Sequence, residues 1–318
     1  AALSIEGVEV TTFACCPCNE RAAIRSRVTC HDAGVKNPVW HDWFARCTPI
    51  RSVDEMEYSK WLRSLPSRAR GLIESSCVGP IETSSSKALT IKAFVKVEKA
   101  VTRITTIYHK QDPVPRLIQG RSVDVKVATG PFTKAYGMAL KNAYSGERGF
   151  LYAGGRTAEE IGKFYDNHKP MSIGGQEYQW VAIDCKRWDR TVGATPLSLL
   201  LKEYKKLGAP PGCLNALCNR EHRQWGRTAH GLKYARRAQV SSGDGDTSAG
   251  NSRLHLVMLE SNQNILAAAV HGDDAIILTC DVQSVLNTYI TGGFTPVPAN
   301  EFDFCSSVFY PTEDGTVL

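Results

Sequence analysis

The chain has 318 residues, of which 42% are hydrophobic and 22% are charged, as in ordinary globular proteins. This length suits one large domain or two to three subdomains, and no apolar run approaches the roughly 20 residues of a membrane-spanning helix. The formal net charge of +6 alone indicates only a slightly basic surface.

The eleven cysteines are irregularly spaced, and the N-terminus lacks the basic start and apolar core of a secretory signal. We therefore expect reduced thiols in a cytosolic setting. The N-terminal CCPC, with Cys15, Cys16 and Cys18, precedes Cys30 and His31 and is a candidate zinc site. Its spacing fits no standard zinc knuckle, so free or buried thiols are the preferred interpretation and zinc is the alternative.

The positive charge is clustered. Residues 91–126 contain eight Lys or Arg against three acids, and residues 220–237 contain six against one. Such clusters are typical of surfaces that bind a polyanion, although two solvated basic faces would give the same pattern.

The first half of the chain predicts short elements. Residues 53–77 place apolar side chains near helical spacing, with a break at Pro66. Residues 92–100 alternate between apolar and polar and predict a strand. Residues 111–121 contain two prolines, followed by a short extended piece.

The second half adds hairpin-connected strands. The expected elements are a strand at 179–184, a helix capped by Thr195 with Pro196 in its first turn, a glycine-rich loop at 241–251 that enters a helix, a hairpin at 265–280, a helix at 281–291 and a closing strand in FDFCSSVFY. Because no regular βαβ rhythm is present, we expect an α+β fold with an antiparallel sheet.

The sequence AAAVHGDDAIILTC places Asp273 and Asp274 at a hairpin tip, and Asp184 ends the strand at 179–184. If these strands are neighbours, Asp184 meets Asp273. Paired carboxylates repel unless a proton or cation neutralises them. Mg²⁺ prefers oxygen ligands and often completes its shell with substrate phosphates. We therefore expect these three aspartates to bind Mg²⁺, with Mn²⁺ as a substitute, and a metal-free polar turn is the alternative.

The segment SSGDGDTSAGN has glycines that let a loop approach a substrate closely. Thr247 and Asn251 are four residues apart and share one helix face. Their hydroxyl and amide are suited to reading a sugar hydroxyl or to positioning a carboxylate such as Asp189. A loop that merely caps the helix is the alternative.

The basic stretch before residue 126 has groups suited to a triphosphate. Arg116 and Arg121 offer guanidinium groups that bind phosphate through two hydrogen bonds, and Lys96, Lys99 and Lys110 add point charges. The chain has no P-loop pattern, so a Walker-type site is not expected.

These segments, in this order, resemble the RNA-dependent RNA polymerases of positive-strand RNA viruses, and in particular tombusvirus-like and carmovirus-like replicases. The resemblance lies in VPRLIQGR (114–121), DCKRWD (184–189), SGDGDTSAGN (242–251), GDD (272–274) and FCSS (304–307). It implies a right-hand polymerase fold with fingers and palm, an antiparallel palm sheet flanked by helices, and a thumb that is largely absent because the sequence stops at Leu318.

The resemblance also implies a division of the chain. It consists of an N-terminal extension and start of the fingers (1–90), fingers (91–175), palm (176–195), a fingers insertion (196–238), palm (239–310) and the start of a truncated thumb (311–318).

By motif match, the resemblance implies a role for each candidate residue. The catalytic, metal-binding residues would be Asp184, Asp273 and Asp274. The nucleotide-binding residues would be Asp189 and Asn251 at the ribose 2′-hydroxyl, with Ser242 and Thr247 helping to hold that network and Gly243 in the same loop. Arg116 would contact the triphosphate, with Arg121 and Lys110 helping. The two basic segments, rather than a motif, are expected to bind RNA, through Lys96, Lys99, Arg220, Arg223 and Arg227. The FCSS match implies that Cys305 and Ser306 lie at the primer end.

One feature departs from the family. The segment between Gly293 and Phe302 contains no lysine, where the family often has the proton donor to pyrophosphate, so that acid has no candidate.

The expected function is RNA-directed RNA polymerisation that replicates a positive-strand viral genome. Its partners would be RNA template and primer, ribonucleoside triphosphates and other viral replication proteins, at membrane-associated complexes in the host cytoplasm. A reverse transcriptase-like enzyme is disfavoured, since such enzymes usually have a bulky aromatic residue in place of a 2′-hydroxyl acceptor such as Asn251. A non-catalytic RNA-binding or scaffold protein is the alternative from another class.

Overall fold

The computed structural model describes residues 3–5, 8–28, 36–54, 56–76, 79, 81–97, 99–103, 114–218, 220, 223–298, 303–305, 307–312 and 315–318. The predicted site residues Lys110 and Ser306 and the zinc candidates Cys30 and His31 lie outside the described residues, and for Lys99 only the backbone is described.

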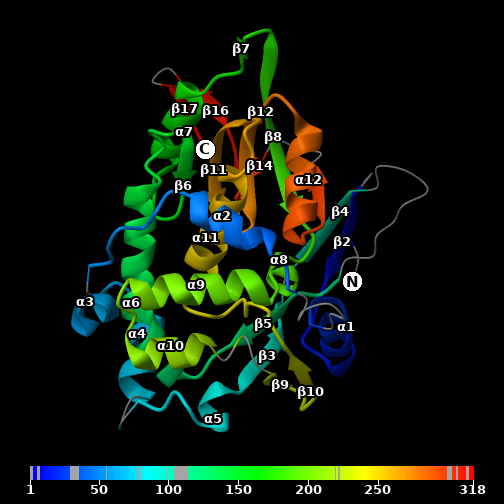
Figure 1. The fold of residues 1–318 in the computed structure, drawn as a ribbon. Helices are drawn as coiled ribbons and strands as arrows, with labels where there is room; N and C mark the ends of the chain where they lie inside the picture. Colours follow the sequence, from blue (N-terminus) through cyan, green and yellow to red (C-terminus); the bar gives the residue numbers. More distant parts are fainter. Residues whose placement is uncertain are drawn as a thin grey trace.

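The helices and strands of the described residues follow in chain order (Figure 1). The helices are α1 (Pro17–Arg27), α2 (Val39–Arg46), α3 (Tyr58–Arg63), α4 (Ser67–Ser76), α5 (Ser86–Leu89), α6 (Val123–Ala143), α7 (Ala158–Asn167), α8 (Trp188–Thr191), α9 (Ala194–Lys206), α10 (Pro211–Cys218), α11 (Thr247–Glu260) and α12 (Val282–Gly292). The strands are β1 (Leu3–Ile5), β2 (Val8–Thr12), β3 (Ile91–Val95), β4 (Lys99–Arg103), β5 (Leu117–Gly120), β6 (Phe150–Tyr152), β7 (Met171–Ile173), β8 (Gln176–Cys185), β9 (Gln224–Thr228), β10 (Lys233–Arg236), β11 (Ile265–His271), β12 (Asp274–Thr279), β13 (Pro296–Pro298), β14 (Asp303–Phe304), β15 (Ser307–Val308), β16 (Tyr310–Thr312) and β17 (Gly315–Val317).

The central sheet lies in the upper half of Figure 1 and has the strand order β13-β8-β12-β11-β6, with β7 paired to β8. Its pairs are antiparallel except for the parallel β11–β6 pair. Both faces of β11 and β12 are buried, since Val270 and Ile277 pack into one apolar cluster and Ala269 and Ile276 into another. Burial on both faces explains why these strands are almost continuously apolar. The predicted α+β class with an antiparallel sheet flanked by helices is confirmed.

A second sheet, in the lower half of Figure 1, has the order β10-β9-β3-β5. The parallel β3–β9 pair joins residues 91–93 to residues 226–228. The predicted fingers insertion therefore shares a sheet with the segment before residue 121. Helix α1 packs on this sheet, with Ala23 in the same buried cluster as Ile91 and Tyr234.

Some predicted boundaries differ from the structure. Strand β6, which lies within the range 91–175 expected in the fingers, pairs in parallel with β11 of the central sheet. The strand expected at 92–100 ends at Val95, and β4 begins in another sheet. Helix α9 is capped by Gly193 and not by Thr195, whose hydroxyl accepts the Asn37 amide at 3.0 Å.

Other predicted elements are confirmed. The break at Pro66 separates α3 from α4, the hairpin at 265–280 is formed by β11 and β12, and the helix at 281–291 corresponds to α12. Residues 311–318, expected to begin a thumb, contribute to a β16–β17 hairpin whose Thr316 amide donates to Asp166 of α7 at 2.7 Å. The division into fingers, palm and thumb stays a prediction.

A buried charge cluster joins three distant parts of the chain. Asp244, in the loop before α11, accepts from Arg121 Nε at 2.5 Å and from Arg220 Nε at 2.9 Å. Asp246 in the same loop pairs with Arg220 and accepts the Tyr204 hydroxyl at 3.0 Å. These four charged side chains are at most 8% exposed. The loop before α11 is thereby held to the end of β5 and to the segment after α10.

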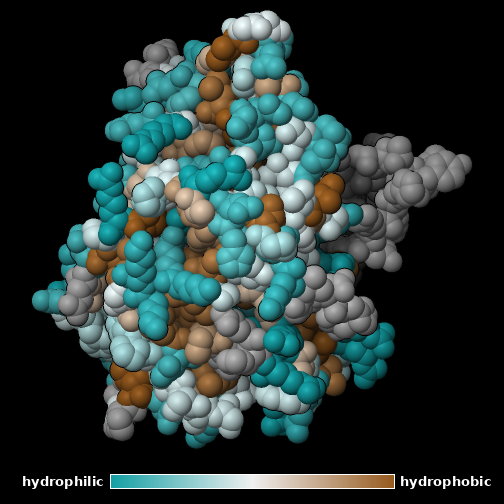
Figure 2. Space-filling model, viewed as in Figure 1, coloured by the Kyte–Doolittle hydropathy of each residue, from teal (hydrophilic) through white to brown (hydrophobic). Residues whose placement is uncertain are grey.

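Figure 2 shows hydrophilic residues over most of one face of the molecule, with apolar residues as separate patches between them. Among the described residues, none of the helices combines the length and the apolar character needed to cross a bilayer.

Asp244→Asn should lower the free energy of unfolding by about 3–5 kcal/mol at pH 7, because it leaves two buried guanidinium groups with too little compensating charge. Although burial by itself raises it, Arg121 and Arg220 hold the pKa of Asp244 well below its ordinary value of 3.8. The stabilisation is therefore complete above about pH 4 and declines as the pH falls below it. Urea denaturation from pH 7 to pH 3 measures the difference.

The exposed Asp54→Asn is the matched control and should change stability by no more than about 0.5 kcal/mol. Equal stability of the two variants at pH 7 would contradict a structural role for the Asp244 ion pairs.

Candidate active site

The candidate site lies where β8 ends beside the turn between β11 and β12. Strands β8 and β12 are antiparallel neighbours with Ile183 opposite Ala275, so Asp184 lies at the same edge as Asp273 and Asp274. Asp184 and Asp273 are exposed. Desolvation by the surrounding protein raises the pKa of Asp273. The negative charge of Asp184 raises it further, because the two carboxylates repel each other. The predicted meeting of the two strand ends is confirmed.

Two side chains of helix α11 form hydrogen bonds with the backbone of Gly272. Its amide donates to Ser252 Oγ at 2.7 Å, and its carbonyl oxygen lies 3.2 Å from Nδ1 of His255. Gly272 has φ +68°, a conformation that favours glycine. The hairpin tip is therefore fixed by hydrogen bonds to both the amide and the carbonyl group of Gly272.

The protonation of His255 follows from its contacts. Burial lowers the pKa of His255 to about 3, so the ring is neutral at pH 7. Because a carbonyl oxygen only accepts, Nδ1 carries the proton and donates to Gly272, and Nε2 accepts from the Tyr289 hydroxyl at 2.5 Å. Sequence reasoning missed Ser252 and His255; the available signal was their spacing of three, which puts two polar groups on one side of a helix.

Asp189 and Asn251 form the predicted pair. Nδ2 of Asn251 donates to Oδ1 of Asp189 at 2.8 Å. Burial raises the pKa of Asp189 to about 6, against the opposing effect of the Asn251 hydrogen bond. The Asn251 side-chain oxygen is buried and has no hydrogen-bond partner among the described residues. The pair thus offers an acceptor to a hydroxyl group that enters beside it.

Ser242, Gly243 and Thr247 fasten the loop instead of extending this pair. Ser242 Oγ accepts the Gln119 amide and donates to the Leu117 carbonyl, both at 3.3 Å. A Cβ on Gly243 would lie 2.6 Å from the Gln119 carbonyl oxygen, so β5 and the loop approach as closely as glycine allows. The Thr247 hydroxyl donates to the Ser241 carbonyl at 2.6 Å. These contacts are compatible with the expectation that Ser242 and Thr247 help to hold the network around Asp189 and Asn251, and a nucleotide-binding role for the three residues stays a prediction.

The two arginines predicted at the triphosphate lie in different environments. Arg116 is exposed, and its charge lowers the pKa of Asp273, so it acts on the acidic tip. Arg121 is 5% exposed and pairs with Asp244. The prediction that Arg121 contacts the triphosphate is wrong in this structure, because its guanidinium group points into the buried cluster.

The predicted RNA-binding arginines also differ in their exposure to solvent. Arg220 is 2% exposed and pairs with Asp244 and Asp246, so the prediction that it contacts RNA is wrong for the same reason. Arg223 lies 4.5 Å above the ring of the exposed Trp225, and Arg227 is exposed two residues further along β9.

These residues belong to one exposed face of the second sheet, which we call the fingers face. On β9, Trp225 and Arg227 alternate with buried residues. Strand pairing places Lys92 of β3 and Lys233 of β10 opposite Arg227. Phe94 is exposed two residues after Lys92. Lys96 is half-buried, and its backbone amide donates to the Arg116 carbonyl at 2.9 Å.

The FCSS segment lies beside the acidic tip. Phe304 is buried, and β14 and β15 form a short hairpin around Cys305, which has φ +55°. Cys305 Sγ lies 3.5 Å from Nδ1 of His271, the residue before the GDD turn. The predicted strand-turn is therefore adjacent to the candidate site, and its contact with a primer end stays a prediction.

The donor set fits Mg²⁺. Asp184 and Asp273 present carboxylate oxygens from an exposed edge. The pKa of Asp273 is raised mainly by desolvation and further by the charge of Asp184, and a bound cation would offset both effects. Asp274 is half-buried at the start of β12 and supplies a third carboxylate near the tip.

Comparisons with known proteins identify the family of the chain. The family model described as "Viral RNA dependent RNA polymerase" matches residues 52–289. Similar proteins include the RNA-directed RNA polymerases of Oat chlorotic stunt virus (28% identical, 77% of this chain and 33% of that protein), Cucumber necrosis virus (26%, 74% and 30%) and Carnation mottle virus (24%, 71% and 30%). The chain thus spans about a third of the length of these relatives.

The fold is also similar to a solved structure, the insertion loop deletion mutant of the RNA-dependent RNA polymerase of a human picorbirnavirus. The TM-score is 0.65 at 10% identity, over 94% of this chain and 64% of that one. The predicted likeness to tombusvirus-like and carmovirus-like polymerases is confirmed by the family match and by the relatives. The chain belongs to the viral RNA-dependent RNA polymerase family.

Proposed function

We propose that this chain carries the catalytic site of an RNA-directed RNA polymerase that replicates a positive-strand viral genome by template-directed nucleotidyl transfer. The single observation that carries the proposal is the meeting of Asp184 and Asp273 at one sheet edge, where their charges repel. Such a pair is suited to Mg²⁺ shared with substrate phosphates.

The candidate residues would have distinct roles in the reaction. Asp184 and Asp273, with Asp274, would hold Mg²⁺ or Mn²⁺. Two such ions, about 3.5–4 Å apart, stabilise both the attacking and the leaving oxygens of phosphoryl transfer. Arg116 is exposed, and its charge lowers the pKa of Asp273; it would bind the triphosphate and offset charge on the departing pyrophosphate.

Sugar selection would rest on the Asp189–Asn251 pair. The buried Asn251 oxygen without a partner is an acceptor for a ribose 2′-hydroxyl, and the hydrogen bond to Asp189 fixes the orientation of the amide. A deoxyribose would leave that oxygen unsatisfied. This supports RNA synthesis over a reverse transcriptase-like activity.

RNA would bind the fingers face. Trp225 and Phe94 are exposed rings on which bases can stack, and the neighbouring Arg227, Lys92 and Lys233 match backbone phosphates. Binding of this kind weakens as salt increases. On the strength of family membership, we further propose that the protein works with other viral replication proteins at membranes of the host cytoplasm.

Asp273→Asn should reduce incorporation of labelled ribonucleotide on a short RNA primer-template by at least about 100-fold, because a metal-binding carboxylate is lost. The affinity for RNA, measured by fluorescence anisotropy, should change little. The exposed Asp54→Asn is the matched control and should retain full activity. Normal turnover of Asp273→Asn at saturating RNA would contradict the assignment.

A second readout does not depend on turnover. Fe²⁺ bound in place of Mg²⁺ reduces added hydrogen peroxide to hydroxide and a hydroxyl radical, and ascorbate returns Fe³⁺ to Fe²⁺. The radicals cut the nearby backbone, and the cuts should lie near residues 184 and 273 and disappear in Asp273→Asn. Cleavage elsewhere, or cleavage equal in both proteins, would point to a non-catalytic RNA-binding protein.

Asn251→Ala should lower the preference for ATP over dATP by about tenfold or more, which corresponds to the loss of one hydrogen bond of about 1.4 kcal/mol. Competition between the two nucleotides measures the ratio. Thr247→Val is the control, because its hydroxyl bonds only the loop backbone in this structure, so it should lower stability without changing the ratio. A changed ratio in Thr247→Val alone would reverse the two roles.

Asp189→Asn should stabilise the free protein at pH 7.5 by about 1–3 kcal/mol and have little effect at pH 4. The pKa of Asp189 is raised to about 6 from its ordinary value of 3.8. The raised pKa therefore favours folding fully at low pH, and this contribution is lost as the pH rises through about 6. Thermal unfolding of both proteins between pH 4 and 7.5 measures the effect. A difference that is independent of pH would show that Asp189 titrates normally.

A further inference from the structure

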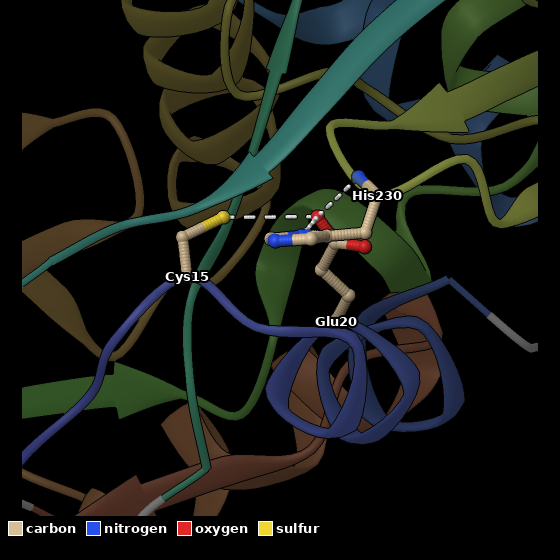
Figure 3. Close-up of side chains that lie close together, drawn as sticks. All are labelled: Cys15, Glu20 and His230. Atoms are coloured by element: carbon tan, nitrogen blue, oxygen red, sulfur yellow. Dashed lines mark hydrogen bonds and ion pairs between the residues drawn. The ribbon is translucent and has the colours of Figure 1, made fainter.

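A thiol, a carboxylate and an imidazole converge outside the candidate active site (Figure 3). Cys15 precedes α1, Glu20 lies in the first turn of α1, and His230 lies in the turn between β9 and β10. One ligand atom from each lies within 4.8 Å of the other two. In the part of the chain that the structure describes, no other three such residues come this close.

Glu20 is the centre of the cluster. Its Oε1 atom lies 3.7 Å from Cys15 Sγ and 3.0 Å from His230 Nδ1. Glu20 is fully buried, and its other oxygen, Oε2, has no hydrogen-bond partner among the described residues. The hydroxyl of the neighbouring Thr228 acts on the carboxylate but falls outside hydrogen-bond geometry with Oε2. A buried carboxylate with one unsatisfied oxygen is a costly arrangement unless a cation joins it.

The distances match a tetrahedral ion of moderate softness. Zn²⁺ binds sulfur at about 2.3 Å and nitrogen or oxygen at about 2.0–2.2 Å, so tetrahedral geometry separates sulfur from oxygen by about 3.6 Å and nitrogen from oxygen by about 3.3 Å. The separations of 3.7 and 3.0 Å around Glu20 Oε1 are close to these values. Mg²⁺ prefers oxygen ligands and does not suit a thiolate.

We propose that Cys15, Glu20 and His230 form a Zn²⁺ site that joins the start of α1 to the β9–β10 turn. Binding releases the thiol proton of Cys15 to solvent, and His230 binds through Nδ1 with its proton on Nε2. The side chain of His230 is 39% exposed, which leaves room for water as a fourth ligand.

The other described thiols of the CCPC segment do not take part. Cys16 Sγ accepts the Asn19 amide at 3.4 Å and so caps α1, and Cys18 is exposed. The site therefore differs from a cluster of neighbouring cysteines, the alternative that the sequence suggested. It uses one of these cysteines together with a histidine 215 residues further along the chain.

A bound ion would add to a modest interface. Of the residues of α1, Glu20 and Ala23 are buried and Ile24 is half-buried against the second sheet, and Glu20 also accepts the His230 backbone amide at 3.3 Å. Because the free energy of metal binding adds to that of the ordered state, Zn²⁺ would hold α1 on the sheet that carries the fingers face. The proposal is independent of the polymerase assignment.

Zinc binding to the whole chain tests the proposal. After chelation and dialysis, the protein is titrated with Zn²⁺ in excess Mg²⁺, which occupies carboxylate sites. We expect one tightly bound Zn²⁺ per chain, and an affinity lowered by at least about 100-fold in Cys15→Ser and in His230→Ala. Cys18→Ser is the matched control and should bind like the unsubstituted protein. Circular dichroism establishes that each variant is folded.

Cobalt provides an independent readout. Co²⁺ in the site should show the near-ultraviolet charge-transfer band of a cobalt–thiolate bond, and Cys15→Ser should lose the band while Cys18→Ser keeps it. Zn²⁺ should raise the melting temperature of the unsubstituted protein and of Cys18→Ser only. Absence of binding to the folded chain would overturn the proposal, as would binding unchanged in Cys15→Ser and His230→Ala. Equal loss in Cys16→Ser and Cys18→Ser would place the metal on the CCPC thiols instead.

Discussion

The buried pairing of Asp244 with Arg121 and Arg220 is the interaction on which the candidate site depends. It fixes the loop before α11 to β5 and to the segment after α10, and the glycine contact between Gly243 and β5 admits no side chain in between. The start of α11 is set by this loop, and α11 in turn holds both the Asn251 amide and the hairpin tip. Arg121 and Arg220, which were expected to bind phosphate groups, thus stabilise the conformation of this loop.

The central part of the fold was predictable because its signals are local. The apolar runs on either side of the GDD turn predict a hairpin, and β8 joins it in the register that brings Asp184 to Asp273. The parallel pairing of β6 with β11 was not predictable, since three apolar residues carry no information about which strand they join. The β3–β9 pair likewise joins segments more than a hundred residues apart, and the sequence of neither segment indicates its pairing partner.

The candidate site was predictable to a similar degree. The spacing of Thr247 and Asn251 put two polar groups on one face, and one of them does reach Asp189. The clustering of basic residues led to the wrong expectation that Arg121 and Arg220 contact phosphates. A count of basic residues does not show which of them are buried and paired with Asp244. Ser252 and His255 were missed, since polar residues inside a helix ordinarily indicate a solvated face, and α11 is instead buried on all sides between residues 249 and 259.

Helix α11 also links two tasks that are usually considered separately. Asn251 meets Asp189 from one turn, and Ser252 and His255 hold Gly272 from the same and the next turn. This one helix therefore sets the distance between the Asp189–Asn251 pair, proposed to bind the ribose, and the acidic hairpin tip, proposed to bind the metal. A change in the packing of α11 would displace both together. Under the proposed function, a substitution in this helix that alters sugar selection would therefore also alter the rate of nucleotide addition.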